Sequence, residues 1–167
     1  MRRLLPAVLA AVLAGCAGYQ LGPSNGLPER SQSVQVRPFV NHTTEPRISE
    51  YLAASMRKRF QQDGTFQLQT SGVPDILVKG EIIRFERTEI SYTTNDVLTP
   101  QEYRLTLTAS IVALDPVSNK TNVSRTVQGQ TFIRAGNDLA SSERQAMPNL
   151  ADDLARNAVS ALVDGIW

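Results

Sequence analysis

A strict alternation of side chains between residues 103 and 113 is the strongest pattern in this 167-residue sequence. Apolar and polar residues alternate there, so an extended chain would point one set to each side. The apolar set is Tyr103, Leu105, Leu107, Ala109, Ile111 and Ala113. Such a strand belongs in a sheet with one apolar face and one polar face. Another layer of structure must therefore cover the apolar face.

Other strands are predicted before and after this one. A run rich in β-branched residues extends from Ile76 to about Tyr92, and residues 93–100, which include Asn95, Asp96 and Pro100, predict a hairpin loop. A turn at 115–119 leads to a strand from Asn122 to Ile133. A short first strand starts at Val34. These segments predict a mostly antiparallel sheet of about four strands.

Two segments predict helices. Pro46 suits the first turn of a helix, and apolar residues recur at spacings of three and four from Ile48 to Phe60, before Gly64 ends the helix. Ser142 and Gln145 resemble a capping box that opens a final helix. Its apolar stripe is Leu150, Leu154, Ala158 and Leu162. The predicted fold is α+β, in the order β-α-β-β-β-α, with both helices packed on one face of the sheet.

The N-terminus has the features of an export signal. Arg2 and Arg3 precede an apolar run at 4–13, which as a helix would be about 15 Å long, about half of what a bilayer core requires. The run is therefore expected to be a cleaved signal peptide. Leu13-Ala14-Gly15-Cys16 looks like a lipobox, the motif that precedes a lipid-bearing cysteine.

Cys16 is expected to carry the lipid. It is the only cysteine, so an ordinary signal peptide would leave it as an unpaired thiol in an oxidising compartment. Ala17 follows it, and lipoproteins without aspartate at that position usually go to the outer membrane. The predicted organisation is a signal peptide at 1–15, the lipidated cysteine and a flexible tether at 16–33, and a single domain at 34–167.

The remaining composition argues against several classes of function. Removing the signal peptide leaves 15 basic and 16 acidic side chains, interspersed along the chain, which does not favour a nucleic-acid partner. His42 is the only histidine, and neither paired carboxylates nor a glycine-rich phosphate loop stands out. We expect no enzymatic activity, no cofactor and no metal.

Two surfaces are candidates for function. The polar face of the sheet is rich in hydroxyls and amides, which suit sugars or the polar inside of another protein, although solvent-facing sheets are also common. Its residues are Thr106, Thr108, Ser110, Ser124, Thr126, Gln128 and Gln130. A second set lies around the hairpin, where arginine forks could bind phosphates, although scattered arginines are usually solvated. It comprises Arg84, Arg87, Tyr92, Arg104 and Arg134.

Five strings of the sequence, in this order and spacing, resemble the LptE family of lipopolysaccharide-assembly lipoproteins. They lie at 13–21, 36–46, 75–82, 102–109 and 150–155. The resemblance implies an outer-membrane lipoprotein that plugs the β-barrel of the LptD translocon, helps that barrel assemble and binds lipopolysaccharide. It would turn the polar face toward the barrel wall and the arginines, with Tyr92, toward lipid A phosphates.

The opening of the domain leaves alternatives. A strand followed by Pro-Phe-x-Asn-x-Thr and a helix, here at 38–43, also occurs in lipoproteins that activate penicillin-binding proteins and in curli-secretion lipoproteins. The long Glu-Tyr-Arg-Leu-Thr-Leu-Thr hairpin strand, followed directly by another strand and a terminal helix, favours the LptE-like interpretation.

Overall fold

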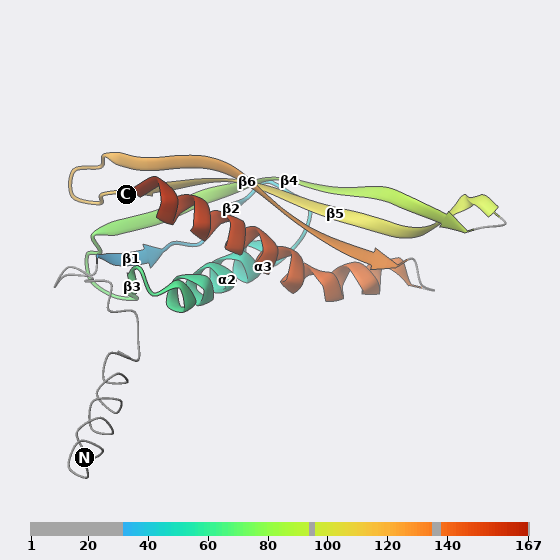
Figure 1. Cartoon of the computed structure of the whole chain (residues 1–167), viewed down its shortest axis with the longest axis horizontal. Helices are drawn as coiled ribbons and strands as arrows, with labels where there is room; N and C mark the ends of the chain where they lie inside the picture. The colour runs from blue at the N-terminus through green and yellow to red at the C-terminus, as the bar shows by residue number, and fades with distance from the viewer. Residues whose placement is uncertain (1–31, 94–95, 135–137, 167) are drawn as a thin grey trace, which may run out of the picture. The chain divides into compact units, whose positions relative to one another are not determined.

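A six-stranded mixed sheet with two helices on one face forms the domain (Figure 1). The computed structural model describes residues 32–93, 96–134 and 138–166. The elements are β1 (Ser33–Val36), β2 (Val40–Asn41), α2 (Ile48–Asp63), β3 (Gln67–Leu68), β4 (Ile76–Thr93), β5 (Asp96–Leu114), β6 (Thr121–Arg134) and α3 (Leu139–Ile166). The predicted signal peptide, Cys16 and most of the tether lie outside the described residues. The α+β class and the two-helix layer are confirmed.

The sheet contains more strands than predicted and is not wholly antiparallel. Its order is β3-β1-β4-β5-β6, and β2 pairs with β4. β4, β5 and β6 are antiparallel, whereas β1 runs parallel to both β3 and β4, and β2 runs parallel to β4. Parallel neighbours need a crossover, which α2 supplies between β1 and β3. β2 has only two residues, too few for alternation to predict it. β3, also of two residues, lies where the alternation of Phe66 and Leu68 favours a short strand.

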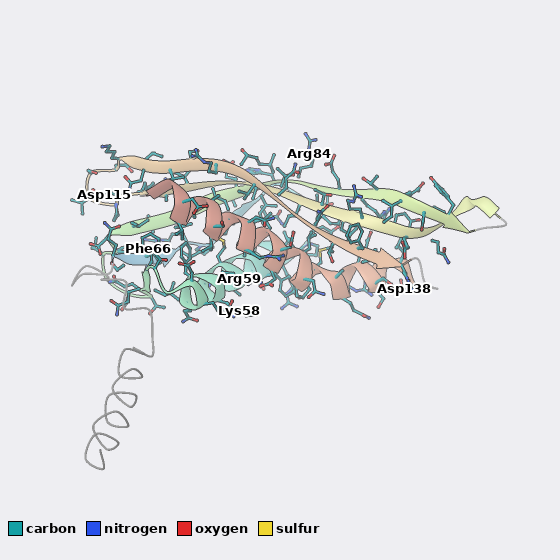
Figure 2. All side chains as sticks on the ribbon, viewed as in Figure 1. Lys58, Arg59, Phe66, Arg84, Asp115 and Asp138 are labelled. Carbon is teal, nitrogen blue, oxygen red and sulfur yellow. The ribbon has the colours of Figure 1, made fainter. Side chains whose placement is uncertain are left out.

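The core lies between the helices and the apolar face of β5. Leu105, Leu107, Ala109, Ile111 and Ala113 are all fully buried, which confirms the predicted direction of every one of these side chains. The apolar stripes of the helices pack against them, with Ile48, Leu52, Met56, Phe60, Leu150, Leu154 and Leu162 at most 1% exposed. The side chains on the other face of the sheet point away from the helices, as Arg84 does in Figure 2.

Both helices begin at a different residue from the predicted one. Pro46 precedes α2, which starts at Ile48 because Arg47 adopts a left-handed conformation with φ 64°. In α3 the helix begins at Leu139, since the Asp138 carboxylate accepts a hydrogen bond from the Ser141 N–H at 3.2 Å. The Ser142–Gln145 capping box is therefore wrong.

The predicted hairpin loop at 93–100 is also wrong, because β4 continues to Thr93 and β5 begins at Asp96. Residues 94–95 lie outside the described part. The loop was inferred partly from Pro100, which cannot donate a ladder hydrogen bond. In the described residues Pro100 is paired with Tyr92 of β4, so it lies within β5 and not in a loop. The predicted end of the first helix is confirmed, because Gly64, with a φ of 74°, caps α2.

Candidate functional site

The sheet face opposite the helices, here called the open face, carries the polar residues singled out in the sequence. β5 and β6 place them directly across from one another, with Thr106 opposite Gln130, Thr108 opposite Gln128 and Ser110 opposite Thr126. Ser124 continues the β6 column opposite Val112. The structure therefore brings all seven into one surface, which we call the polar band.

The polar groups of this band are available to a partner. Thr106, Thr108 and Ser110 are half-buried in the middle of the sheet, and the four residues from β6 are exposed. In the part of the chain that the structure describes, none of the seven side chains makes a hydrogen bond with another protein group. Hydroxyls and amides both donate and accept, so the band can match varied polar surfaces.

α3 holds the outer edge of the polar band. The Gln130 N–H donates to the Asp153 carboxylate at 2.9 Å, and the Asn157 side-chain amide donates to the Gln128 carbonyl at 2.8 Å. Gly129, between these two residues, lies against the α3 backbone. These contacts fix the position of β6 and use hydrogen-bonding groups that an edge strand would otherwise present to another chain.

β4 borders the polar band with charged side chains. Arg84 pairs with Glu86 at 3.5 Å on this face, and His42 approaches Glu81 at 3.2 Å. The register shift between Ile82 and Arg84 is a bulge that leaves Ile83 exposed. The uncharged band on β5 and β6 is thus bounded on one side by a charged strand.

The exposed aromatic residue Phe132, which was not among the predicted site residues, ends the polar band. Phe132 is 57% exposed and lies opposite Arg104, whose guanidinium carbon is 5.5 Å from the ring centroid. Its even position on β6, in phase with Gln128 and Gln130, is the signal that could have placed it on this face. Beyond this pair, Arg134 bonds to Glu102 at 3.2 Å.

The five residues predicted to bind phosphates are divided between the two faces of the sheet. Arg84, Arg104 and Arg134 share the open face, because their strand partners Thr108, Phe132 and Glu102 lie there. Arg87 is on the helix side, where it bonds to Glu143 of α3 at 2.5 Å and stacks over Tyr103. Tyr92 donates its hydroxyl to Glu89 at 2.9 Å, and Glu89 is the partner of Tyr103.

Arg87 and Tyr92 both have raised pKa values. The hydrogen bond to Glu143 raises the pKa of Arg87 above its ordinary value, outweighing the effect of desolvation. The hydrogen bond to Glu89 raises the pKa of Tyr92. Both partners stabilise the protonated side chain, so Arg87 and Tyr92 are engaged by carboxylates of the protein itself.

The described residues offer neither a cluster of metal ligands nor a membrane-crossing helix. They contain no group of three or more histidine, cysteine, aspartate or glutamate side chains suited to a metal ion. Their helices include none with the length and apolar character needed to cross a membrane.

The sequence family LptE, described as lipopolysaccharide-assembly, matches residues 31–162, which is almost the whole described domain. The chain belongs to the LptE family. Its family role is therefore lipopolysaccharide assembly, which is not an enzymatic one. No curated protein sequence matches the chain.

Solved structures share the fold of this LptE-family chain at low sequence identity. The hypothetical protein CT253 from Chlamydia trachomatis is 11% identical, with a TM-score of 0.57 over 81% of this chain and 97% of that one. A PelC dodecamer from Paraburkholderia phytofirmans is 12% identical, with a TM-score of 0.54 over 78% of this chain and 88% of that one. A minor lipoprotein from Acinetobacter baumannii is 16% identical, with a TM-score of 0.53 over 80% of this chain and 94% of that one.

Proposed function

We propose that this chain is an outer-membrane lipoprotein that plugs an LptD-type β-barrel, helps that barrel assemble and binds lipopolysaccharide in transit. The observation that carries the proposal is the polar band, a free and uncharged surface in a chain of the lipopolysaccharide-assembly family. The anchor in this proposal is a lipid on Cys16, next to the lipobox.

The chemistry of the polar band suits the inside of a barrel. Membrane barrels have polar inner walls, which hydroxyl and amide groups can match by donating or accepting hydrogen bonds. A band without charges also avoids burying an unpaired ion, which costs several kcal/mol in a formed interface. Phe132 at the end of the band adds an exposed aromatic side chain of the kind that dominates many interfaces.

Lipopolysaccharide binding is proposed for the arginines of the open face. Arg104 is the leading residue, since it stacks on Phe132 and has no carboxylate partner among the described residues. Arg84 and Arg134 form exposed ion pairs, which contribute little and can exchange a carboxylate for a lipid A phosphate. Arg87 and Tyr92 play a smaller part in this proposal because each is already bonded to a carboxylate of the protein.

The decisive test places charge on the polar band. The triple variant Thr108→Lys, Thr126→Lys, Gln128→Lys should fold normally, because these side chains face solvent in the free protein. Binding to the barrel should fall by about 100-fold or more, because the new charges would be buried without partners. Co-purified LptD should drop, and outer-membrane permeability to large antibiotics should rise.

A matched control carries the same three charges on the solvent side of the helices. Ala54→Lys, Gln61→Lys and Asn149→Lys replace exposed residues of α2 and α3. This control should still co-purify with LptD, and the outer membrane should stay impermeable to large antibiotics. If both triple variants recover the barrel in full, the polar band is only solvated and the barrel contact is elsewhere. Recovery of a penicillin-binding protein in place of LptD would instead support the alternative lipoprotein class.

A further inference from the structure

A second polar surface lies at the other edge of the sheet, where β1, β3 and α2 come together (Figure 1). A hollow of about 460 Å³ opens there between three segments. They are residues 35–37 at the end of β1, Arg57 of α2, and the loop 69–72 that follows β3. None of these residues belongs to the polar band or to the arginine set described above.

Strand pairing determines how the loop lies beside β1. Val34 is in register with Leu68, and the Gln69 N–H donates to the Val34 carbonyl at 2.8 Å. The Gln35 side-chain amide then reaches the Thr70 carbonyl at 3.4 Å. The loop turns at Gly72, whose φ of 85° favours glycine. The loop therefore has a defined path along one wall of the hollow.

Two arginines line the hollow. Arg57 is half-buried, and its Nη2 donates to the Val36 carbonyl at 3.1 Å, which holds the side chain against the end of β1. That bond uses one of the five N–H donors of a guanidinium. Arg37 follows β1 directly and is exposed, with its backbone N–H bonded to the Val78 carbonyl. Most donors of both groups remain free to bind a ligand.

These two arginines lack the carboxylate partners that most others have. Seven of the eleven arginines in the described residues form ion pairs, and two of the remaining four line this one hollow. Among the described residues no aspartate or glutamate lines it, whereas the polar residues Gln35, Gln69, Thr70 and Ser71 do. Lys58, the neighbour of Arg57, points away from the sheet in Figure 2. The hollow is therefore a concentration of positive charge surrounded by neutral donors.

We propose that this hollow binds a phosphate group. Guanidinium forks bind phosphate oxygens in pairs, and a tetrahedral anion has enough acceptors to use both arginines and the nearby hydroxyls together. The phosphate can come from a phospholipid headgroup or from free phosphate. β1 begins at Ser33, the last residue of the segment proposed to tether the domain to its lipid. A headgroup source therefore rests on the proposed anchor, but the phosphate site does not.

The test uses the full-length protein purified in a nonionic detergent. In the first arm, its melting temperature is followed against sodium phosphate, with sodium chloride at equal ionic strength as the reference. In the second arm, the micelles are doped with phosphatidic acid, which presents a phosphate monoester headgroup. The variants are Arg37→Gln and Arg57→Gln. The matched control is Arg125→Gln, which removes an exposed arginine that also lacks a carboxylate partner.

Phosphate or phosphatidic acid should raise the melting temperature of the wild type and of Arg125→Gln equally. In Arg37→Gln the half-maximal concentration should rise about tenfold or more, the effect of losing charge-assisted hydrogen bonds. If Arg57→Gln is too unstable to titrate, Arg37→Gln still decides, since its side chain makes no hydrogen bond in the described chain.

The two arms separate the sources of phosphate. Stabilisation by phosphatidic acid at headgroup concentrations where inorganic phosphate has no effect would identify a lipid site, and equal potency would identify a free-phosphate site. The proposal is overturned if the wild type responds to neither probe, or if Arg37→Gln and Arg125→Gln respond alike. The melting experiment does not depend on binding to the barrel. If the proposed function fails, the phosphate response of the hollow would therefore be unchanged.

Discussion

Gly129 shows how a single residue can determine the distance between the sheet and the helix layer. A Cβ atom added there would lie 2.4 Å from the backbone nitrogen of Leu154 in α3, closer than real atoms approach. The absence of a side chain lets α3 lie directly against β6. That proximity in turn allows Asp153 and Asn157 to reach the backbone of Gln130 and Gln128.

We therefore predict that Gly129→Ala destabilises the domain by about 1 to 3 kcal/mol or more, because the clash is with backbone, which cannot rotate away. Urea unfolding followed by circular dichroism measures this. Gln128→Ala is the control, since the adjacent side chain is exposed and its loss should stay within about 0.5 kcal/mol. Equal unfolding midpoints for the two variants would contradict the close approach of α3.

At the scale of elements, β5 gives the sheet its two distinct faces. Leu107 and Thr108 are neighbours in sequence but point to opposite sides, one fully buried under the helices and the other in the polar band. A shift of one residue in pairing would exchange the two faces entirely. The register of this strand therefore determines both the core and the candidate binding surface.

This register makes a quantitative prediction. Leu107→Ala should cost about 2 to 5 kcal/mol, because it removes buried apolar surface and leaves a cavity. Thr108→Ala should cost little, since its hydroxyl makes no hydrogen bond within the described chain. The measurement is the free energy of unfolding in urea for each variant. Similar losses at both positions would mean that the strand is paired differently.

The elements also show which features can be predicted from sequence. The alternation in β5 and β6 specifies side-chain direction, so the core positions of β5 and the seven residues of the polar band could be predicted. Pro100 predicts a loop, yet it is paired with Tyr92 of β4, and the extent of this pairing cannot be predicted from the local sequence. Arg37 and Arg57 were missed for a related reason: they are 20 residues apart in sequence, and only the packing of α2 against β1 brings them to one hollow.

At the scale of the whole molecule, the described domain carries its helices on one face and leaves the other face open. We predict that Cys16→Ala accumulates as an unprocessed precursor and no longer carries a lipid, while the domain from residue 34 onward stays folded. Palmitate labelling and processing, followed by gel mobility, measure this. Normal processing and labelling of Cys16→Ala would contradict the lipobox.

Ala17→Asp is the companion variant for membrane sorting. It should be processed and labelled with palmitate like the wild type, because Cys16 is intact. It should then remain in the inner membrane, since aspartate after the modified cysteine is expected to prevent transfer. Fractionation of inner and outer membranes measures the difference, and an unchanged distribution would contradict the sorting role given to Ala17.

The contacts of Asp153 and Asn157 with β6 protect the edge of the sheet against association with other copies of the chain. A protein confined to a membrane plane meets its own copies far more often than one free in three dimensions, and an open sheet edge invites such copies to join strand to strand. Here α3 occupies the middle of one edge, and the other edge ends in β3, only two residues long. If the proposed lipid on Cys16 concentrates the domain at a membrane, its copies can therefore remain separate molecules, and the open face of each stays free to meet the barrel.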